Sequence, residues 1–219
     1  MKSYAQHCPL ARALDVVGER WNLLIVRELI LGPRRFRDLL DGLPGVPTNL
    51  LAARLKDLQA AGVIDKRTLP PPTDVTVYEL TESGHELRPA LLALRAWGSR
   101  HAPAASESDS LRPAWLLLSA AGRPTLLPAG HTCELRVDSD HFSLGVEGST
   151  LTVRGGPAHD PNAVITMSTR TLYRIMAGQA SAARNLTVEG NPLVARNAVE
   201  SLRGALEPQR AGVSRPSRS

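Results

Sequence analysis

Side chains that could neutralise or hydrogen-bond a polyanion are concentrated between residues 34 and 67. Arginine and lysine supply positive charges that contact phosphates, and asparagine and threonine can hydrogen-bond the edges of bases. On this basis the candidate DNA contacts are Arg34, Arg35, Arg37, Thr48, Asn49, Arg54, Lys56, Lys66 and Arg67. A charged residue on a helix is often simply solvated, so the elements that carry these residues decide between the two interpretations.

The segment 48–61 is the strongest helix prediction of this region. Three leucines recur at i, i+4 and i+7 and predict a buried stripe, formed by Leu51, Leu55 and Leu58. Thr48 and Asn49 begin the helix, where a helix lying in the major groove meets base edges. Arg54 and Lys56 lie further along and suit phosphate contacts. Alternatively, Thr48 does no more than cap the helix.

The neighbouring elements follow a recognisable order. Apolar periodicity and turn residues predict helices over 9–17, 22–31, 34–40 and 48–61, strands over 63–69 and 75–80, and a helix over 82–101. Thr81 can cap the last helix, and Pro89 should kink or restart it. Helices followed by a β-hairpin with a Pro-rich tip at 70–74 and a closing helix predict a winged helix-turn-helix.

Short motifs also run through this part of the chain. They are Cys8-Pro9, Gly18 to Trp21, Gly32-Pro33 with Arg35-Phe36 and Asp38-Leu39, Leu43 to Val46, Leu51 with Leu55-Lys56 and Leu58, Gly62 to Ile64, and Tyr78 to Gly84. This set resembles the HxlR-type winged helix-turn-helix transcriptional regulators of the MarR-like superfamily. The resemblance implies that residues 1–102 bind double-stranded DNA and dimerise. Many relatives carry a longer polar or basic residue at the position of Asn49, so no operator sequence is implied.

The resemblance further implies a homodimer whose interface is built from the first and last helices of the module. The residues concerned are Leu10, Leu14, Val17, Leu87, Leu91, Leu94 and Trp97. A two-fold dimer would read a palindromic operator with half-sites about one helical turn apart. The alternative is that the leucine stripe packs within its own chain.

Cys8 is the candidate for redox sensing. Several members of the resembled family sense quinones, aldehydes or oxidants through a cysteine at this position. Cys8 precedes Pro9 and so stands where a helix begins, and thiols at helix N-termini are more reactive than average. The alternative is a small buried side chain without a chemical role.

A different pattern begins after the small, polar stretch 103–110, which predicts a linker. The expected elements are a helix over 114–121, strands over 132–137, 141–146, 150–154 and 163–167, a helix over 169–177, a strand over 185–188 and a helix over 192–206. Ser168 or Thr169 can cap the middle helix, and Gly190-Asn191-Pro192 forms the later turn. This order resembles a sterol carrier protein type 2-like domain over 111–207. Residues 208–219 are polar and basic, and we expect them to be disordered.

The second resemblance implies an apolar tunnel between sheet and helices. Its candidate lining residues are Phe142, Leu144, Ile165, Leu172, Ile175, Met176 and Leu193. Such a tunnel would accept an apolar effector, for example an acyl, terpenoid or polyketide-like molecule. The alternatives are that these residues are ordinary core or that the domain only dimerises.

Composition excludes several classes. The net charge of +5 is compatible with a polyanionic partner. The two cysteines, Cys8 and Cys133, form neither a disulfide framework nor a zinc spacing. No apolar run approaches the length needed to span a bilayer, and the first residues lack the apolar core of a signal peptide. We therefore expect a reduced, cytoplasmic protein with no membrane partner, and the HxlR-type resemblance implies a protein of bacterial type.

Catalytic motifs are absent from the sequence. None of the six histidines stands at a metal-ligand spacing. No nucleotide-binding glycine motif and no Gly-x-Ser-x-Gly occurs. We expect no metal, no cofactor and no enzymatic activity.

These patterns predict an α/β (α+β) protein with an N-terminal winged helix-turn-helix and a C-terminal sterol carrier-like α+β domain. The expected function is that of a dimeric transcriptional regulator modulated by an apolar small molecule. One rival is a lipid or small-molecule carrier whose winged helix has become a protein-interaction scaffold. The other is a thiol or quinone sensor acting through Cys8.

Overall fold

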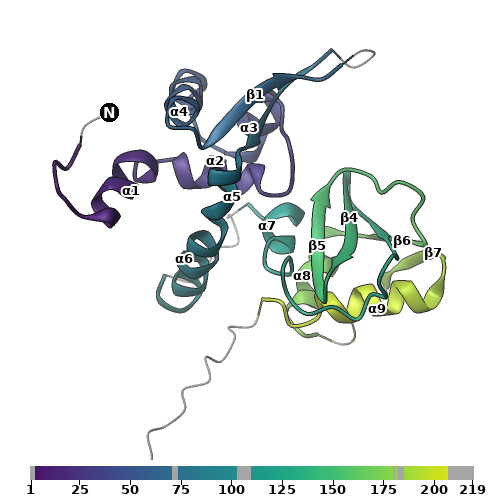
Figure 1. Ribbon diagram of the computed structural model, residues 1–219. Coiled ribbons are helices and arrows are strands. Elements are labelled where there is room, and N and C mark those ends of the chain that lie inside the picture. The colour runs from purple at the N-terminus through teal and green to yellow at the C-terminus, as the bar shows by residue number, and fades with distance from the viewer. Residues whose placement is uncertain (1–2, 71–73, 103–109, 180, 182–184, 207–219) are drawn as a thin grey trace, which may run out of the picture.

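The computed structural model describes residues 3–70, 74–102, 110–179, 181 and 185–206. They form two units, here called the N-terminal half (3–102) and the C-terminal half (110–206), which lie side by side (Figure 1). The N-terminal half contains α1 (Pro9–Val17), α2 (Asn22–Leu29), α3 (Phe36–Gly42), α4 (Thr48–Ala60), β1 (Ile64–Thr68), β2 (Thr76–Leu80), α5 (Glu82–Glu86) and α6 (Arg88–His101). The C-terminal half contains α7 (Pro113–Leu117), β3 (Cys133–Val137), β4 (Asp140–Glu147), β5 (Thr150–Gly155), β6 (Ala163–Met167), α8 (Thr169–Met176), β7 (Thr187–Gly190) and α9 (Pro192–Leu202).

The N-terminal half is built around the buried face of α4. The predicted stripe of Leu51, Leu55 and Leu58 is at most 1% exposed, and it packs in one core with residues of α2, α3 and β1. Gly62 ends this segment at φ +71, a left-handed conformation that glycine adopts without strain. β1 and β2 then form the antiparallel wing, with Ile64 opposite Leu80.

Local capping chemistry sets the elements after the wing. The Thr81 hydroxyl accepts a hydrogen bond from the Gly84 N–H at 3.1 Å and so caps α5, as predicted. The long predicted helix is interrupted at Leu87, and α6 restarts with Pro89 in its first turn. This confirms the restart that Pro89 predicted.

The third helix begins two residues later than predicted. Arg34 is extended, because its N–H donates to the Tyr78 carbonyl and its carbonyl accepts from the Tyr78 N–H. Both backbone groups are therefore unavailable to a helix. α3 starts at Phe36 after Arg35, whose N–H donates to the Asp38 carboxylate at 3.0 Å. The helix predicted over 114–121 is also shorter, since α7 ends at Leu117 and turns follow.

The C-terminal half is a five-stranded sheet with helices packed against it. Its strand order is β5-β4-β3-β6-β7, in which β3 and β6 are parallel and the other pairs antiparallel. α9 packs on β3 and β6, and α8 packs between α7 and α9 (Figure 1). Ser168 caps α8 and Asn191 caps α9, through hydrogen bonds to Thr171 N–H and Leu193 N–H.

Some predictions fall outside the described residues. They concern nearly all of the linker 103–110, the centre of the wing tip 70–74, and the basic segment 208–219. Within the ranges that are described, no helix has both the length and the apolar character to cross a membrane.

Candidate nucleic-acid interface

The first turn of α4 presents polar side chains to solvent. Thr48 and Asn49 are exposed, and so is Lys56 two turns later. Pro47 occupies the N-cap position, so Thr48 is the first helical residue and is free of the capping role that was its alternative. The Asn49 carboxamide oxygen accepts the Leu50 N–H at 3.0 Å. Because the leucine stripe of α4 faces the core, Thr48 and Asn49 form a short polar edge that faces solvent, as contact with base edges requires.

Arg54 lies on the same helix but is held inside the protein. Its Nη2 is 2.7 Å from Glu19 Oε2 and its Nη1 is 3.3 Å from Asp57 Oδ2. Its side chain is only 19% exposed. A phosphate contact by Arg54 would first require these ion pairs to break. In this structure Arg54 instead ties α4 to the loop between α1 and α2.

The three arginines before α3 separate into two groups. Arg35 and Arg37 are exposed. Arg34 is half-buried, and its guanidinium lies against Gly155 at the end of β5, where a Cβ on that glycine would stand 3.3 Å from Nη2. The side chain of Arg34 therefore faces the C-terminal half.

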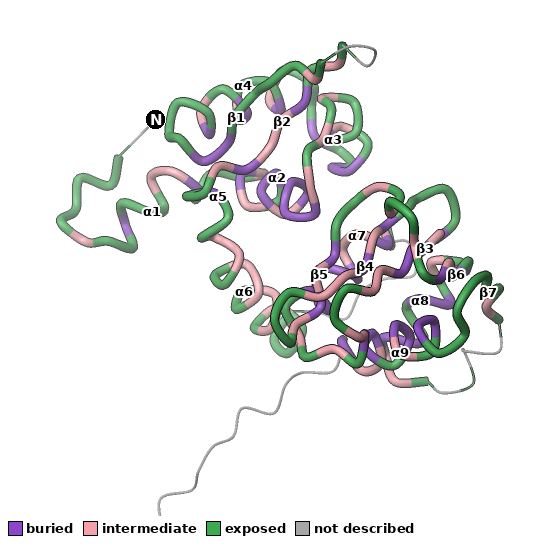
Figure 2. The backbone as a smooth tube through the Cα atoms, turned by 45° about the vertical axis from the view of Figure 1, so that its right-hand side comes forward, coloured by how far each residue is buried: buried purple, intermediate pink, exposed green. Residues whose placement is uncertain are grey.

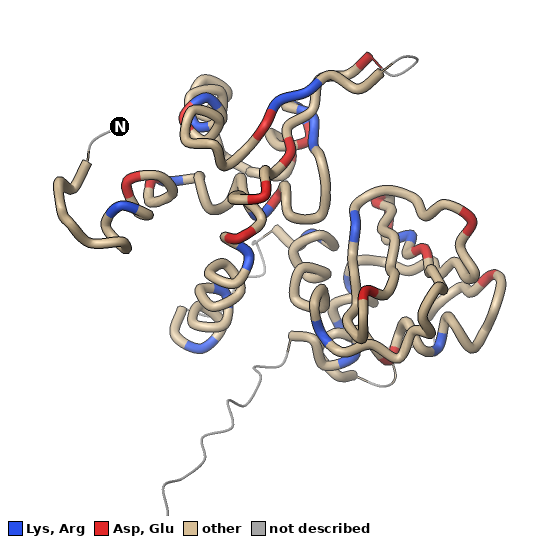
Figure 3. Tube along the Cα trace, viewed as in Figure 1, with Lys and Arg blue, Asp and Glu red and all other residues tan. Residues whose placement is uncertain are grey.

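The wing carries its basic residues on β1, where Figure 3 shows a continuous basic stretch. Lys66 and Arg67 are both exposed. The Lys66 ammonium lies 5.9 Å from the centre of the Tyr78 ring, and Arg67 Nε lies 2.6 Å from Glu79 Oε1. Cross-strand pairs of this kind hold the two basic side chains on the wing.

The predicted dimer residues are largely uncovered in the single chain. Leu10, Leu94 and Trp97 are more than half exposed, and Leu14 is 39% exposed. α6 contains no fully buried residue (Figure 2). Leu87 and Leu91 pack partly against the core, and Val17 is fully buried. The monomer thus leaves an apolar face on α1 and α6 and uses Val17 for its own interior.

The two cysteines have different surroundings. Cys8 is half-buried at the N-cap of α1, and its carbonyl accepts the Arg12 N–H. Cys133 is fully buried in β3, and burial together with the neighbouring Glu134 raises its pKa to about 12. A thiol that is both buried and protonated is unreactive. Of the two, Cys8 is the thiol open to chemistry.

The predicted tunnel residues lie in the core of the C-terminal half. Six of them are at most 1% exposed and belong to one packed cluster: Phe142, Leu144, Ile165, Leu172, Ile175 and Met176. Leu193 differs, because it lies on the first turn of α9 and is 52% exposed. It therefore does not line this interior.

Sequence reasoning missed the junction between the halves. Trp115 of α7 donates its indole N–H to Glu28 of α2 at 2.7 Å, and the Arg27 guanidinium stacks 4.2 Å from the centre of the Trp115 ring. Arg27 also pairs with Glu28 at 2.8 Å. The sequence feature that could have indicated this junction is Glu28, a carboxylate on the apolar face of α2.

Among the described residues no cluster of His, Cys, Asp and Glu could hold a metal ion.

Residues 16–106 match the family model described as HxlR-like helix-turn-helix. The HTH-type transcriptional regulator sll1512 of Synechocystis is 38% identical over 92 residues, which are 42% of this chain and 68% of the relative. The HTH-type transcriptional regulator YodB of Bacillus subtilis is 33% identical over 42% of this chain and 84% of its own length. A solved structure of the reduced form of YodB covers 46% of this chain and 100% of its own, with 30% identity and a TM-score of 0.41.

Proposed function

This chain is a member of the HxlR-like helix-turn-helix family, and on that premise we propose that it regulates transcription as a homodimer bound to a palindromic DNA site. The observation that carries the proposal is the outward edge of α4. Thr48 and Asn49 stand exposed at its start, and Arg35, Arg37 and the β1 residues Lys66 and Arg67 are also exposed. Its relatives sll1512 and YodB are themselves HTH-type transcriptional regulators.

We assign the polar edge of α4 to base contact and the surrounding cations to phosphate contact. Arg35, Arg37, Lys56, Lys66 and Arg67 are the exposed cations, and each phosphate they neutralise would release a counterion. Arg34 and Arg54 contribute less to phosphate contact, because Arg34 faces the C-terminal half and Arg54 is paired with two carboxylates.

The apolar face on α1 and α6 supports the dimer. A two-fold axis would bring Leu10, Leu14, Leu94 and Trp97 of each protomer against the same residues of the other, removing several exposed apolar side chains from water. The two α4 helices would then contact half-sites about one helical turn apart. Such a regulator would act in the cytoplasm and would need no catalytic centre.

Selection of bound sequences from a pool of random duplex DNA tests the regulator proposal. The purified full chain is titrated into the pool at near-physiological salt, and the bound fraction is sequenced. Enrichment of a palindrome, with affinity that falls steeply as salt rises, is the expected result. Weak binding without an enriched site would contradict it and favour the carrier hypothesis.

For the C-terminal half we propose a sterol carrier-like domain that binds an apolar effector. Support comes from the element order: a three-strand meander, a fourth strand, the Ser168-capped α8, the strand β7, and the Asn191-capped α9. The tightly packed core would have to open to admit a ligand. A bound effector would change the spacing of the two α4 helices and hence operator affinity. Equal operator affinity with and without a bound long-chain acyl probe would end this proposal.

A second route to a signal is oxidation of Cys8. The observation that favours it is position, since this half-buried thiol begins α1, the helix that also carries Leu10 and Leu14. Modification there would disturb the proposed dimer face. Operator affinity measured before and after diamide treatment of wild type and C8S tests it, and an equal response of both proteins would exclude Cys8.

A further inference from the structure

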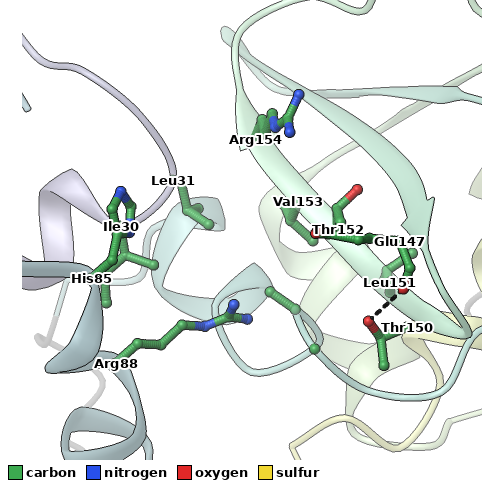
Figure 4. Close-up of a pocket in the computed structure, with 12 residues that line it drawn as sticks. Ile30, Leu31, His85, Arg88, Glu147, Thr150, Leu151, Thr152, Val153 and Arg154 are labelled. Atoms are coloured by element: carbon green, nitrogen blue, oxygen red, sulfur yellow. Dashed lines mark hydrogen bonds between the residues drawn. The ribbon is translucent and has the colours of Figure 1, made fainter. Parts of the chain in front are cut away.

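A cavity of about 250 Å³ lies between the two halves (Figure 4). The N-terminal half contributes the end of α2 and the junction of α5 and α6, and the C-terminal half contributes β5 and the turn at Ala121 and Gly122. The cavity is distinct from the core of the C-terminal half and from the outward edge of α4. Any molecule bound there would contact both halves at once.

Arg88 is the dominant charged group of this cavity. It projects from the start of α6 across the space toward β5 (Figure 4). Its Nε and Nη2 atoms are both buried and have no hydrogen-bond partner among the described residues. Buried guanidinium nitrogens are normally paired, because desolvation of an uncompensated cation costs several kcal/mol. An anion is the partner that this arrangement lacks.

Gly122 leaves space for the Arg88 guanidinium. A Cβ at this position would stand 3.2 Å from Arg88 Nη2, and the backbone has φ +79, so a side chain would be crowded and strained. The Gly122 N–H donates to the Leu151 carbonyl at 2.8 Å. The turn is thus held to the edge of β5 while leaving room for the arginine above it.

The edge of β5 contributes a backbone donor to the lining of the same cavity. The Leu151 N–H donates outward to the Arg123 carbonyl at 2.8 Å, and the Gly155 N–H donates outward to the Leu31 carbonyl at 2.6 Å. In an antiparallel strand every second residue directs its N–H and carbonyl to the same edge. Val153 lies midway between these two positions, so its N–H and carbonyl face the cavity.

The remaining walls define the size and character of an occupant. Ile30 and Leu31 present buried apolar side chains, while Thr150, His85 and Arg154 add polar or basic groups. Glu147 is the acidic lining residue, and it forms no ion pair with Arg88 within 4.0 Å in the described structure. The cavity is therefore cationic at Arg88, apolar at α2 and too small for a long acyl chain.

We propose that this cavity binds a small carboxylate with a compact apolar body. The carboxylate pairs with the Arg88 guanidinium and accepts the Val153 N–H, and the apolar body lies against Ile30 and Leu31. Because the ligand contacts α2 and α6 on one side and β5 on the other, its binding stabilises the docking of the two halves. The site does not depend on DNA binding or on the apolar effector.

Benzoate is a suitable probe, and benzamide is its neutral counterpart of the same shape. Titration calorimetry on the full-length wild type should show saturable binding of benzoate with one site per chain, at least tenfold tighter than that of benzamide. Melting temperature should rise with benzoate concentration. A wild type without saturable benzoate binding overturns the proposal, as does equal binding of the two probes.

Variants at Arg88 locate the site. R88M keeps the aliphatic stem and removes a half-buried cation whose Nε and Nη2 atoms have no partner among the described residues, so the ligand-free protein should melt at the same temperature or higher. It should lose benzoate affinity at least tenfold, and R88K should retain part of it. R100M is the matched control, since Arg100 is exposed further along α6. Benzoate binding by R88M equal to that of R100M would place the ligand elsewhere and overturn the proposal.

Discussion

The two halves of the molecule keep their candidate functional residues in opposite environments. In the N-terminal half Thr48, Asn49, Arg35 and Arg37 are exposed on elements whose other faces form the core. In the C-terminal half the candidate ligand-binding residues are nearly all core themselves, Phe142 among them. A surface site can therefore be separated from the residues that maintain the fold, whereas an interior site cannot. The halves should respond differently to substitution.

The largest expected effect is on DNA affinity, from the double variant R35A/R37A. Both side chains are exposed, so their loss should leave the fold intact. Each charge-assisted contact to a phosphate contributes on the order of 1.5–3 kcal/mol, so we expect affinity to fall at least a hundredfold. The slope of affinity against salt should also become shallower by about two.

The matched control is R170A/R174A, which removes two exposed arginines from α8 in the C-terminal half. Electrophoretic mobility shift over a range of salt concentrations compares the two variants. Equal losses would mean that the overall positive charge, and not the placement of Arg35 and Arg37, drives binding.

The next largest effect is on unfolding, from a substitution at the junction where the two halves contact each other. W115A removes the donor to Glu28 and the ring beneath Arg27, leaving a nearly buried carboxylate with one partner fewer. Truncating a large aromatic costs about 3 kcal/mol. In differential scanning calorimetry the wild type should unfold in one transition and W115A in two. Y173A is the control, since Tyr173 is an exposed aromatic on α8, and a single transition for W115A would show that this contact does not couple the halves.

Sequence alone was sufficient for most of the fold. Periodicity, proline and capping residues predicted the order of the helices and strands, with α5 and α6 expected as one helix over 82–101 that Pro89 would kink or restart, and Thr81 and Pro89 act as expected. The errors lie at the ends of elements. Arg34 was assigned to a helix because its pairing with Tyr78 involves a residue far away in the sequence, and a local pattern carries no trace of such a contact.

The sequence was enough to predict which residue types form the candidate DNA-contact site, but not the role of each residue in it. Arg54 has the same chemistry as Arg37, yet it is paired with Glu19, which lies 35 positions earlier. Arg88 was not singled out at all, because its significance comes from a cavity formed by two halves. Local motifs identify exposed surface residues well, and they fail where distant segments meet.

A smaller effect is expected from a buried carboxylate of the C-terminal half. Burial would raise the pKa of Glu134, but hydrogen bonds from Arg136, His141 and the Ala158 N–H outweigh it, and the pKa lies below its ordinary value of 4.5. Because the pKa of Glu134 is lower in the folded state than in the unfolded state, its ionised carboxylate stabilises the fold at pH values above the ordinary pKa. This stabilisation is lost as the pH falls through the folded-state pKa. E134Q should therefore destabilise by roughly 2 kcal/mol at neutral pH and by progressively less in acid.

Urea unfolding between neutral and strongly acidic pH measures this difference. E200Q is the control in the same half, because Glu200 makes only an exposed pair with Arg203 at 2.9 Å and such pairs contribute little. A difference between wild type and E134Q that did not shrink in acid would show that the side chain acts through packing and not through its charge.

The smallest effect on fold or affinity is expected from the cysteines, one in each half, and it gives the most direct view of how the halves differ. Cys8 is half-buried, whereas burial and Glu134 raise the pKa of Cys133 to about 12. A disulfide reagent at pH 8 should label one thiol in the native chain and both after denaturation. C8S should abolish native labelling, and C133S should leave it unchanged. Labelling of Cys133 that is faster than labelling of Cys8 would mean that the sheet of the C-terminal half opens more readily than the start of α1. The C-terminal core would then be the mobile part of the molecule, into which an apolar ligand could enter.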